Sequence, residues 1–182
     1  MNTYKTEGIV LKRINFGEAD KIVTLYSKHY GKITCLAKGM RRLTSRKRGN
    51  LEIFNKVVFI ACKGKGIDII TETESIESFS SLRKDLSKIA CAYQFCEMVD
   101  KLTAENSEQG EVYDLLCSSL PTLQKADRGN LSVITDIFAG NLLKLLGFWP
   151  KEKLFPNNFD ITMFIEDIIE KELKSKKFLA KI

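Results

Sequence analysis

Lys21-Ile-Val-Thr-Leu-Tyr-Ser27 and Lys32-Ile-Thr-Cys-Leu-Ala37 stand on either side of the short stretch His29-Tyr30-Gly31. The first run alternates apolar with polar residues, which is the pattern of a strand with one buried face. The glycine-containing stretch then turns the chain into the second run. Together they predict two neighbouring strands joined by a turn.

Three further β-like segments flank this pair. Residues 6–14 contain Ile-Val-Leu, residues 51–62 are rich in β-branched and aromatic residues, and residues 67–74 follow the turn Lys63-Gly-Lys-Gly66. Five short strands at even spacing, joined by glycine-containing turns, predict a small barrel or sandwich. We expect a five-stranded Greek-key barrel of the OB type, although the strand count alone leaves an SH3-like barrel open.

From Ser81 onward the apolar residues recur with a helical period. The first helix would bury one stripe, made of Leu82, Leu86, Ile89, Tyr93, Cys96 and Val99. A second helix is expected from Glu108 to about Leu123, with Pro121 kinking or ending it.

A third helix, capped by Asn130 and stopped by Gly147, is apolar nearly all round and would form the centre of a bundle. A last helix after Asp160 would present one apolar face as far as Leu173. The chain is therefore predicted to be an α+β protein, with a β-barrel followed by an all-helical part.

The stretch Lys38-Gly-Met-Arg-Arg-Leu-Thr-Ser-Arg-Lys-Arg48 carries six basic residues and no acidic one. Because these charges repel one another, the folded protein alone gains little from crowding them, whereas a polyanion would be attracted. The stretch is expected to be a long basic loop between two strands. It indicates a nucleic-acid contact, with a merely solvated charged loop as the alternative.

The charge of the whole chain is unevenly distributed. Residues 1–70 hold 15 basic and 5 acidic residues, whereas residues 71–182 hold 14 basic and 18 acidic residues. Such a field attracts phosphates to the N-terminal part. Since the sequence turns acidic and serine-rich near residues 71–81, we predict two domains, an OB-fold nucleic-acid-binding domain at 1–75 and a helical domain at 81–182.

The sequence offers little for catalysis, metal binding or membrane insertion. The single histidine, His29, lies in a predicted turn, and no phosphate-loop, nucleophile-elbow or zinc-protease motif occurs. The five cysteines form no C-x-x-C pair, so buried free thiols in a reducing compartment are expected. No run approaches the roughly 18 apolar residues of a membrane span. We therefore expect a soluble, cytoplasmic protein that is not an enzyme and needs no cofactor or metal.

Two N-terminal stretches resemble the opening of the bacterial recombination mediator family RecO. They are Thr6–Ser27, with its Gly17-Glu-Ala-Asp20 turn, and Gly31–Arg46, with its Lys-Gly-Met-Arg-Arg loop. Further along, Leu142-Leu-Lys-Leu-Leu-Gly-Phe-Trp-Pro150 is similar to the end of a helix in that family. Leu173–Leu179 is similar to its closing segment. The similarities occur in the family's order.

The resemblance implies an OB domain joined to a helical domain, and a nucleoid-associated protein. It also implies binding to single- and double-stranded DNA, annealing of complementary strands, and joint action with RecR to help RecA replace single-strand-binding protein on gapped DNA. Of the loop cations, four match the family motif and two extend it, and Arg13 at the end of the first strand could join them. The expected DNA contacts, which would neutralise phosphates, are therefore Arg13, Lys38, Arg41, Arg42, Arg46, Lys47 and Arg48.

Other parts of the family pattern concern aromatic residues, zinc and a partner tail. Five aromatic residues of the first domain could stack on bases, but core packing is the preferred interpretation for each: Phe16, Tyr26, Tyr30, Phe54 and Phe59. Many members carry a four-cysteine zinc insertion after the Leu-Gly-aromatic-x-Pro motif. No cysteine follows Pro150, so the insertion is expected to be missing and zinc is not expected. The acidic tail of single-strand-binding protein could dock near Lys144, Lys151 and Lys153.

Two alternatives remain at this stage. An OB-type RNA-binding module would share the basic loop without annealing DNA. A protein–protein adaptor would act through the helical domain and carry the basic loop incidentally. A salt titration of nucleic-acid binding separates the adaptor from the other two, and paired DNA and RNA probes separate those two from each other.

Overall fold

The structure is a computed structural model that describes residues 2–179, with side chains described as far as residue 176. The chain forms two compact units. One contains the residues up to 78 together with 104–113, and the other contains 79–103 and the residues from 114 onward. The boundaries expected from the sequence, 1–75 and 81–182, remain a prediction. What the structure adds is that residues 104–113 cluster with the first unit.

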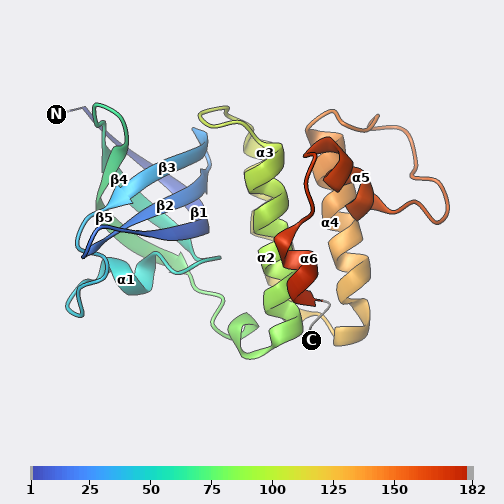
Figure 1. Ribbon diagram of the computed structural model, residues 1–182, viewed down its shortest axis with the longest axis horizontal. Helices are drawn as coiled ribbons and strands as arrows, with labels where there is room; N and C mark the ends of the chain where they lie inside the picture. Colours follow the sequence, from blue (N-terminus) through green and yellow to red (C-terminus); the bar gives the residue numbers. More distant parts are fainter. Residues whose placement is uncertain (1, 180–182) are drawn as a thin grey trace. The chain divides into compact units, whose positions relative to one another are not determined.

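The first unit is a closed five-stranded barrel (Figure 1). Its strands are β1 (Thr3–Phe16), β2 (Asp20–Ser27), β3 (Gly31–Ala37), β4 (Lys56–Cys62) and β5 (Asp68–Glu77). They follow one another around the barrel in the order β1-β2-β3-β5-β4, and β1 pairs with β4 to close it. The β3–β5 pair is parallel, the other pairs are antiparallel, and the short helix α1 (Lys47–Asn50) lies between β3 and β4. This arrangement confirms the predicted OB-type barrel.

The barrel interior is filled by the inward-facing residues of the alternating runs. Val23 and Leu25 of β2 are fully buried, as are Val10 of β1 and Ile70 of β5. They pack in one cluster, which also includes Phe59. Val23 and Leu25 contribute to this core with a two-residue period, but Thr24 and Tyr26 between and beside them are buried as well. The expectation of a single buried face is therefore wrong for β2.

The predicted aromatic residues divide between core and surface. Tyr26, Phe54 and Phe59 are buried, as expected for core packing. Phe16 is 52% exposed at the end of β1, so the core interpretation is wrong for this residue. Tyr30 is 38% exposed, so the core interpretation is wrong here too; its ring centroid lies 4.7 Å from that of Tyr4.

The fourth strand begins later than its composition predicts. Residues 51–55 form a loop, and β4 starts at Lys56. The backbone N–H of Phe54 donates to the carbonyl of Val10 (2.8 Å), and that of Val10 donates to the carbonyl of Asn55 (3.0 Å). The Asn55 amide also donates to two carbonyls at the end of α1. The apolar residues here thus anchor a loop against β1 instead of extending the strand.

Residues 104–113 belong to the barrel unit because they bond to it. Lys32 and Glu105 form a parallel bridge, and the N–H of Asn106 donates to the Lys32 carbonyl (2.8 Å). The Tyr113 hydroxyl donates to the carboxylate of Glu7 (3.0 Å). This contact and Lys56 outweigh the effect of burial on Glu7, and the pKa of that carboxyl is lowered.

The second unit is helical. Its principal helices are α2 (Leu86–Leu102), α3 (Gly110–Lys125, which begins in the first unit), α4 (Leu131–Leu145), α5 (Ile161–Ile168) and α6 (Lys174–Leu179). Two short 3₁₀ helices, Leu82–Lys84 and Arg128–Asn130, precede α2 and α4. Helix α2 packs against both α4 and α6, and Phe95 stacks on Phe138 with ring centroids 4.0 Å apart. Within residues 2–179, no helix is both long and apolar enough to cross a membrane.

The helical predictions hold in outline and differ in detail. Helix α3 continues through Pro121, because buried leucines on both sides of the proline (Leu116, Leu120 and Leu123) keep the helix packed. The predicted stripe of α2 is wrong at Leu86 and Tyr93, which are 60% and 40% exposed. Helix α4 is not buried all round, because Val133 and Ile137 are more than half exposed.

The last predicted helix is two helices, α5 and α6. The chain leaves helical geometry at Glu170, whose φ is 52°. The N-terminus of α6 is capped by Glu97 of α2, which accepts from the N–H groups of Lys174 (3.0 Å) and Ser175 (2.8 Å). A carboxylate at a helix N-terminus is favourable, and it explains why a new helix starts there.

Candidate nucleic-acid interface

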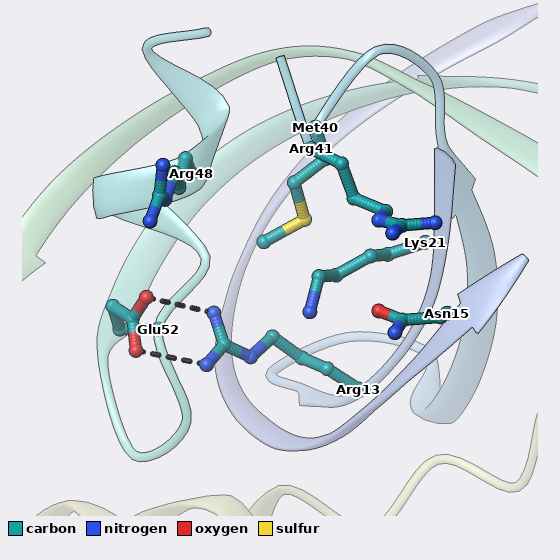
Figure 2. A pocket seen from close by; sticks show the side chains of 7 residues that line it. All are labelled: Arg13, Asn15, Lys21, Met40, Arg41, Arg48 and Glu52. Atoms are coloured by element: carbon teal, nitrogen blue, oxygen red, sulfur yellow. Dashed lines mark hydrogen bonds and ion pairs between the residues drawn. The ribbon is translucent and has the colours of Figure 1, made fainter. Parts of the chain in front are cut away.

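One end of the barrel is hollowed by a pocket of about 360 Å³ (Figure 2). Seven side chains line it, four of them cationic and one a carboxylate: Arg13, Asn15, Lys21, Met40, Arg41, Arg48 and Glu52. We call this the basic pocket. Its residues come from β1, β2, the loop after β3, α1 and the loop before β4.

Strand register explains how β1 and β2 contribute. Asn15 pairs directly with Lys21 across the two strands, and Arg13 precedes Asn15 by two residues. Residues two apart on a strand share a face, and directly paired residues point to the same side. The hairpin therefore presents all three side chains to the same pocket.

The loop after β3 is held on this hairpin by hydrogen bonds. The N–H of Gly39 donates to the Asp20 carboxylate (2.7 Å), and the N–H of Arg41 donates to the carbonyl of Ala19 (2.8 Å). The Arg41 guanidinium also donates to the carbonyl of Gly17 (3.0 Å), while Met40 is fully buried. The basic stretch is thus fixed at the rim of the pocket.

Helix α1 brings Arg48 to the pocket and turns Lys47 away from solvent. The Lys47 ammonium donates to the carbonyl of Ile70 in β5 (2.7 Å), and burial lowers the pKa of this lysine. The amide of Asn50 donates to the carbonyl of Thr73 (2.7 Å). Both contacts fasten α1 to β5, with Arg48 exposed.

Arg13 and Glu52 form a bidentate ion pair at the pocket wall (Figure 2). Its two hydrogen bonds measure 2.8 Å and 2.9 Å. The Nε atom of the guanidinium is buried and has no hydrogen-bond partner among the described residues. Arg13 is therefore rigidly positioned, and its charge is largely balanced by Glu52.

Lys21 is the electrostatically strained member of the pocket. Burial lowers the pKa of its ammonium most, and the nearby charge of Arg13 lowers it further. Glu52 acts in the opposite direction, and Arg41 and Arg48 each lower the pKa by less than Arg13 does. The positive charges around the pocket thus disfavour the charged form of Lys21. An anion placed among these side chains would relieve that repulsion.

The seven predicted contact residues separate into three groups. Arg13, Arg41 and Arg48 line the basic pocket. Lys38, Arg42 and Arg46 are exposed on the same loop outside the pocket lining. Lys47 is bonded to Ile70 as described above.

The sequence alone does not identify Lys21 as a site residue, because it is the first residue of the strand-like run Lys21–Ser27 and lies outside the basic stretch. Its signal was available in the hairpin: a turn around Gly17 aligns the start of β2 with the end of β1, beside Arg13. No charge pattern along the chain shows this, because the two residues are neighbours only through strand pairing.

A metal centre finds no support in the described part of the chain, where no three His, Cys, Asp or Glu side chains are grouped to hold an ion. The cysteines are free thiols; four are buried, and Cys117 is partly buried. Burial raises the pKa of Cys35 to about 12, so this thiol is inert at neutral pH.

The basic pocket lies beside the β1–β2 loop, a region with which OB barrels bind oligonucleotides or oligosaccharides. Comparison with known families shows which family of OB-type proteins the chain resembles. Residues 1–79 match the family described as recombination protein O N terminal, and residues 83–152 match recombination protein O C terminal. The chain belongs to the recombination protein O (RecO) family.

Several curated relatives carry the name DNA repair protein RecO. That of Acetivibrio thermocellus is 37% identical over 150 residues, covering 82% of this chain and 59% of the relative. Those of Pelotomaculum thermopropionicum and Rubrobacter xylanophilus are 35% and 34% identical, over 57% and 60% of their lengths. The chain thus spans somewhat under two thirds of the length of these relatives.

Proposed function

We propose that this protein binds single- and double-stranded DNA through the basic pocket and the exposed cations beside it. We call the whole surface the basic face, consisting of Arg13, Lys21, Lys38, Arg41, Arg42, Arg46 and Arg48. Lys47 contributes least, because its ammonium is already bonded to the Ile70 carbonyl. The observation that carries the proposal is the convergence of four cationic side chains beside the β1–β2 loop of an OB-type barrel.

The proposed activity is annealing of complementary strands, leading to RecA loading on gapped DNA coated with single-strand-binding protein. Two DNA strands repel one another through their phosphates. A protein that holds one strand on a basic face neutralises part of that charge and lets the second strand approach. These contacts concern the backbone, so the binding is not sequence-specific.

RecR and single-strand-binding protein are the proposed protein partners. The helical unit carries a cluster of aromatic rings in which Trp149 stacks on Phe155 (4.7 Å), with Lys144 lying 5.6 Å from the centre of the Phe155 ring. Lys153 lies 5.9 Å from the Trp149 ring, and the neighbouring Leu154 is 83% exposed. Cations beside apolar groups suit an acidic peptide with an aromatic end, which is the chemistry proposed for the tail of single-strand-binding protein.

The decisive experiment measures annealing of two complementary oligonucleotides, one coated with the cognate single-strand-binding protein. The test variant is Arg41→Ala/Arg42→Ala/Arg46→Ala. The control variant is Lys5→Ala/Lys28→Ala/Lys65→Ala. It removes three exposed positive charges near the strand ends that lie away from the basic pocket. We expect wild type and control to accelerate annealing and the test variant to lose most of the effect. Equal loss in both variants would show that net charge alone matters.

A salt titration separates the remaining possibilities. A single strand held by about five phosphate contacts should give a log–log slope of affinity against salt of roughly −3.5. Absence of binding would favour the protein–protein adaptor. Equal or tighter binding of RNA without strand annealing would favour the RNA-binding module.

A further inference from the structure

We infer that the basic pocket is a subsite for a strand end, and that it takes a terminal phosphate monoester together with its nucleotide. The inference rests on the proposed DNA binding and adds a preference to it. The exposed cations Lys38, Arg42 and Arg46 contact the continuous backbone, whereas the pocket recognises where a strand stops.

The charge of the pocket is the first argument. Arg13 is already paired with Glu52, which leaves Lys21, Arg41 and Arg48 without a carboxylate partner among the described residues. An internal phosphodiester carries one negative charge, whereas a terminal phosphate carries about 1.5 to 2 at neutral pH and has three acceptor oxygens. The second anion matches the three lining cations better than the first. Figure 2 shows Lys21 extending toward Arg13 and Glu52, whereas the Arg41 guanidinium, which donates to the Gly17 carbonyl, points away from Glu52.

The size and shape of the pocket are the second argument. Its volume of about 360 Å³ exceeds what a phosphate needs and lies at the lower end of the range for small-molecule sites. Walls are supplied by five separate segments of the chain. A concave site of this kind accepts the last nucleotide of a strand, which has neighbours on one side only.

The mixed chemistry of the lining is the third argument. Asn15 offers an amide, Met40 a thioether, and Glu52 keeps lone pairs beyond those used by Arg13. A carboxylate oxygen repels a phosphate but accepts a hydrogen bond from a sugar hydroxyl or a base amino group. The pocket therefore matches a phosphate and its attached nucleoside better than a bare phosphate.

The test compares labelled single strands of about 12 nucleotides, within the span of one OB barrel, that differ only in their ends. One carries a 5′-phosphate, one a 3′-phosphate, and one hydroxyls at both ends. Fluorescence anisotropy should show about ten-fold tighter binding of one phosphorylated strand, as one additional charge-assisted contact provides. Which of the two is preferred identifies the end that the pocket accepts.

The variants separate the pocket from the rest of the basic face. The ratio that matters is the affinity for the preferred phosphorylated strand divided by the affinity for the strand with hydroxyls at both ends. Lys21→Met and Arg48→Ala should each reduce this ratio to near one. Arg42→Ala/Arg46→Ala, outside the pocket, should weaken binding of all strands and keep the ratio. Equal affinities for all three strands in the wild type would overturn the end-binding inference and leave DNA binding intact, whereas no binding of any strand would remove the proposed function itself.

A second measurement needs no DNA strand. A ligand that binds only the folded state raises the melting temperature. At millimolar concentration, deoxyadenosine 5′-monophosphate and deoxyadenosine 3′-monophosphate should therefore raise the melting temperature of the wild type, one more than the other. Deoxyadenosine, which has no phosphate, should leave it unchanged. The Lys21→Met variant should show no such shift. Identical behaviour of all three compounds in the wild type would count against the pocket as a nucleotide-end site.

Discussion

The guanidinium of Arg13 and the carboxylate of Glu52 form two parallel hydrogen bonds, of 2.8 Å and 2.9 Å, between β1 and the loop that precedes β4. The Arg13 side chain is 17% exposed and that of Glu52 is 37% exposed. The pair stabilises the pocket wall, and it also places a negative charge inside a site suited to anions. The negative charge of Glu52 therefore favours the stability of the folded protein and disfavours anion binding in the pocket.

Replacing Glu52 with glutamine should separate these two roles. Glu52→Gln removes the charge that balances Arg13, and we expect the free energy of unfolding to fall by about 1 kcal/mol, the upper range for a partly exposed ion pair. Affinity for single-stranded DNA should rise, because a repulsive charge has gone. Urea unfolding and fluorescence anisotropy measure the two effects. Glu72→Gln, on the exposed part of β5, is the control for net charge, and an equal rise in DNA affinity there would contradict a local role of Glu52.

Replacing Lys21 with methionine should stabilise the unliganded protein while weakening DNA binding. The pKa of Lys21 is lowered by burial and by the neighbouring arginines, so the folded state holds this proton less tightly than the unfolded state does. The penalty on the folded state is thus fully present at neutral pH. It diminishes as pH rises from the lowered pKa toward 10.5, the ordinary value for lysine.

Urea unfolding of wild type and Lys21→Met across this pH range tests that prediction. The variant should be the more stable at neutral pH, and the difference should narrow toward pH 10.5. Lys65→Met, at an exposed lysine of the β4–β5 turn, controls for the loss of one charge. A variant that is less stable than wild type at neutral pH would show that Lys21 is a structural contact.

Tyr26 should make the fold sensitive to alkaline pH. Burial raises the pKa of its hydroxyl from 10.0 to about 12. The unfolded chain ionises first, so this contribution to stability is fully present below about pH 10 and is lost as pH rises through about 12. Tyr26→Phe should lose less stability than wild type over that interval, as measured by urea unfolding. Tyr30→Phe, at a partly exposed tyrosine, should follow the wild type.

The sequence predicts the barrel well because its strands are defined locally. The strand-like runs, the glycine turns and the even spacing all concern neighbouring residues, and the runs recur as strands such as β2 and β3. The break between α5 and α6 could not be predicted in this way. The start of α6 depends on Glu97, whose carboxylate accepts a hydrogen bond from the N–H of Lys174, 77 residues further along the chain.

The candidate site shows the same division between local and distant effects. The basic stretch is visible in the sequence, and two of its cations, Arg41 and Arg48, line the pocket. Its internal differences are not visible: Lys47 bonds to Ile70, and Lys21 joins the pocket, only because of pairing across the barrel. Lys21 and Lys47 count equally in the net charge, but in the fold Lys21 lines the pocket whereas the ammonium of Lys47 is bonded to a backbone carbonyl.

Gly31 gives the most direct test of the segment 104–113, which lies against the barrel. Its φ is +63°, and a Cβ there would collide with the carbonyl oxygen of Ser107. Gly17 has a similar φ of +56° with open space around it, so Gly17→Ala should cost only the backbone strain, about 1–2 kcal/mol. Gly31→Ala should cost clearly more in urea unfolding and should speed hydrogen exchange at Asn106, whose N–H donates to Lys32. Equal losses in the two variants would mean that residues 104–113 can move away from β3 without cost.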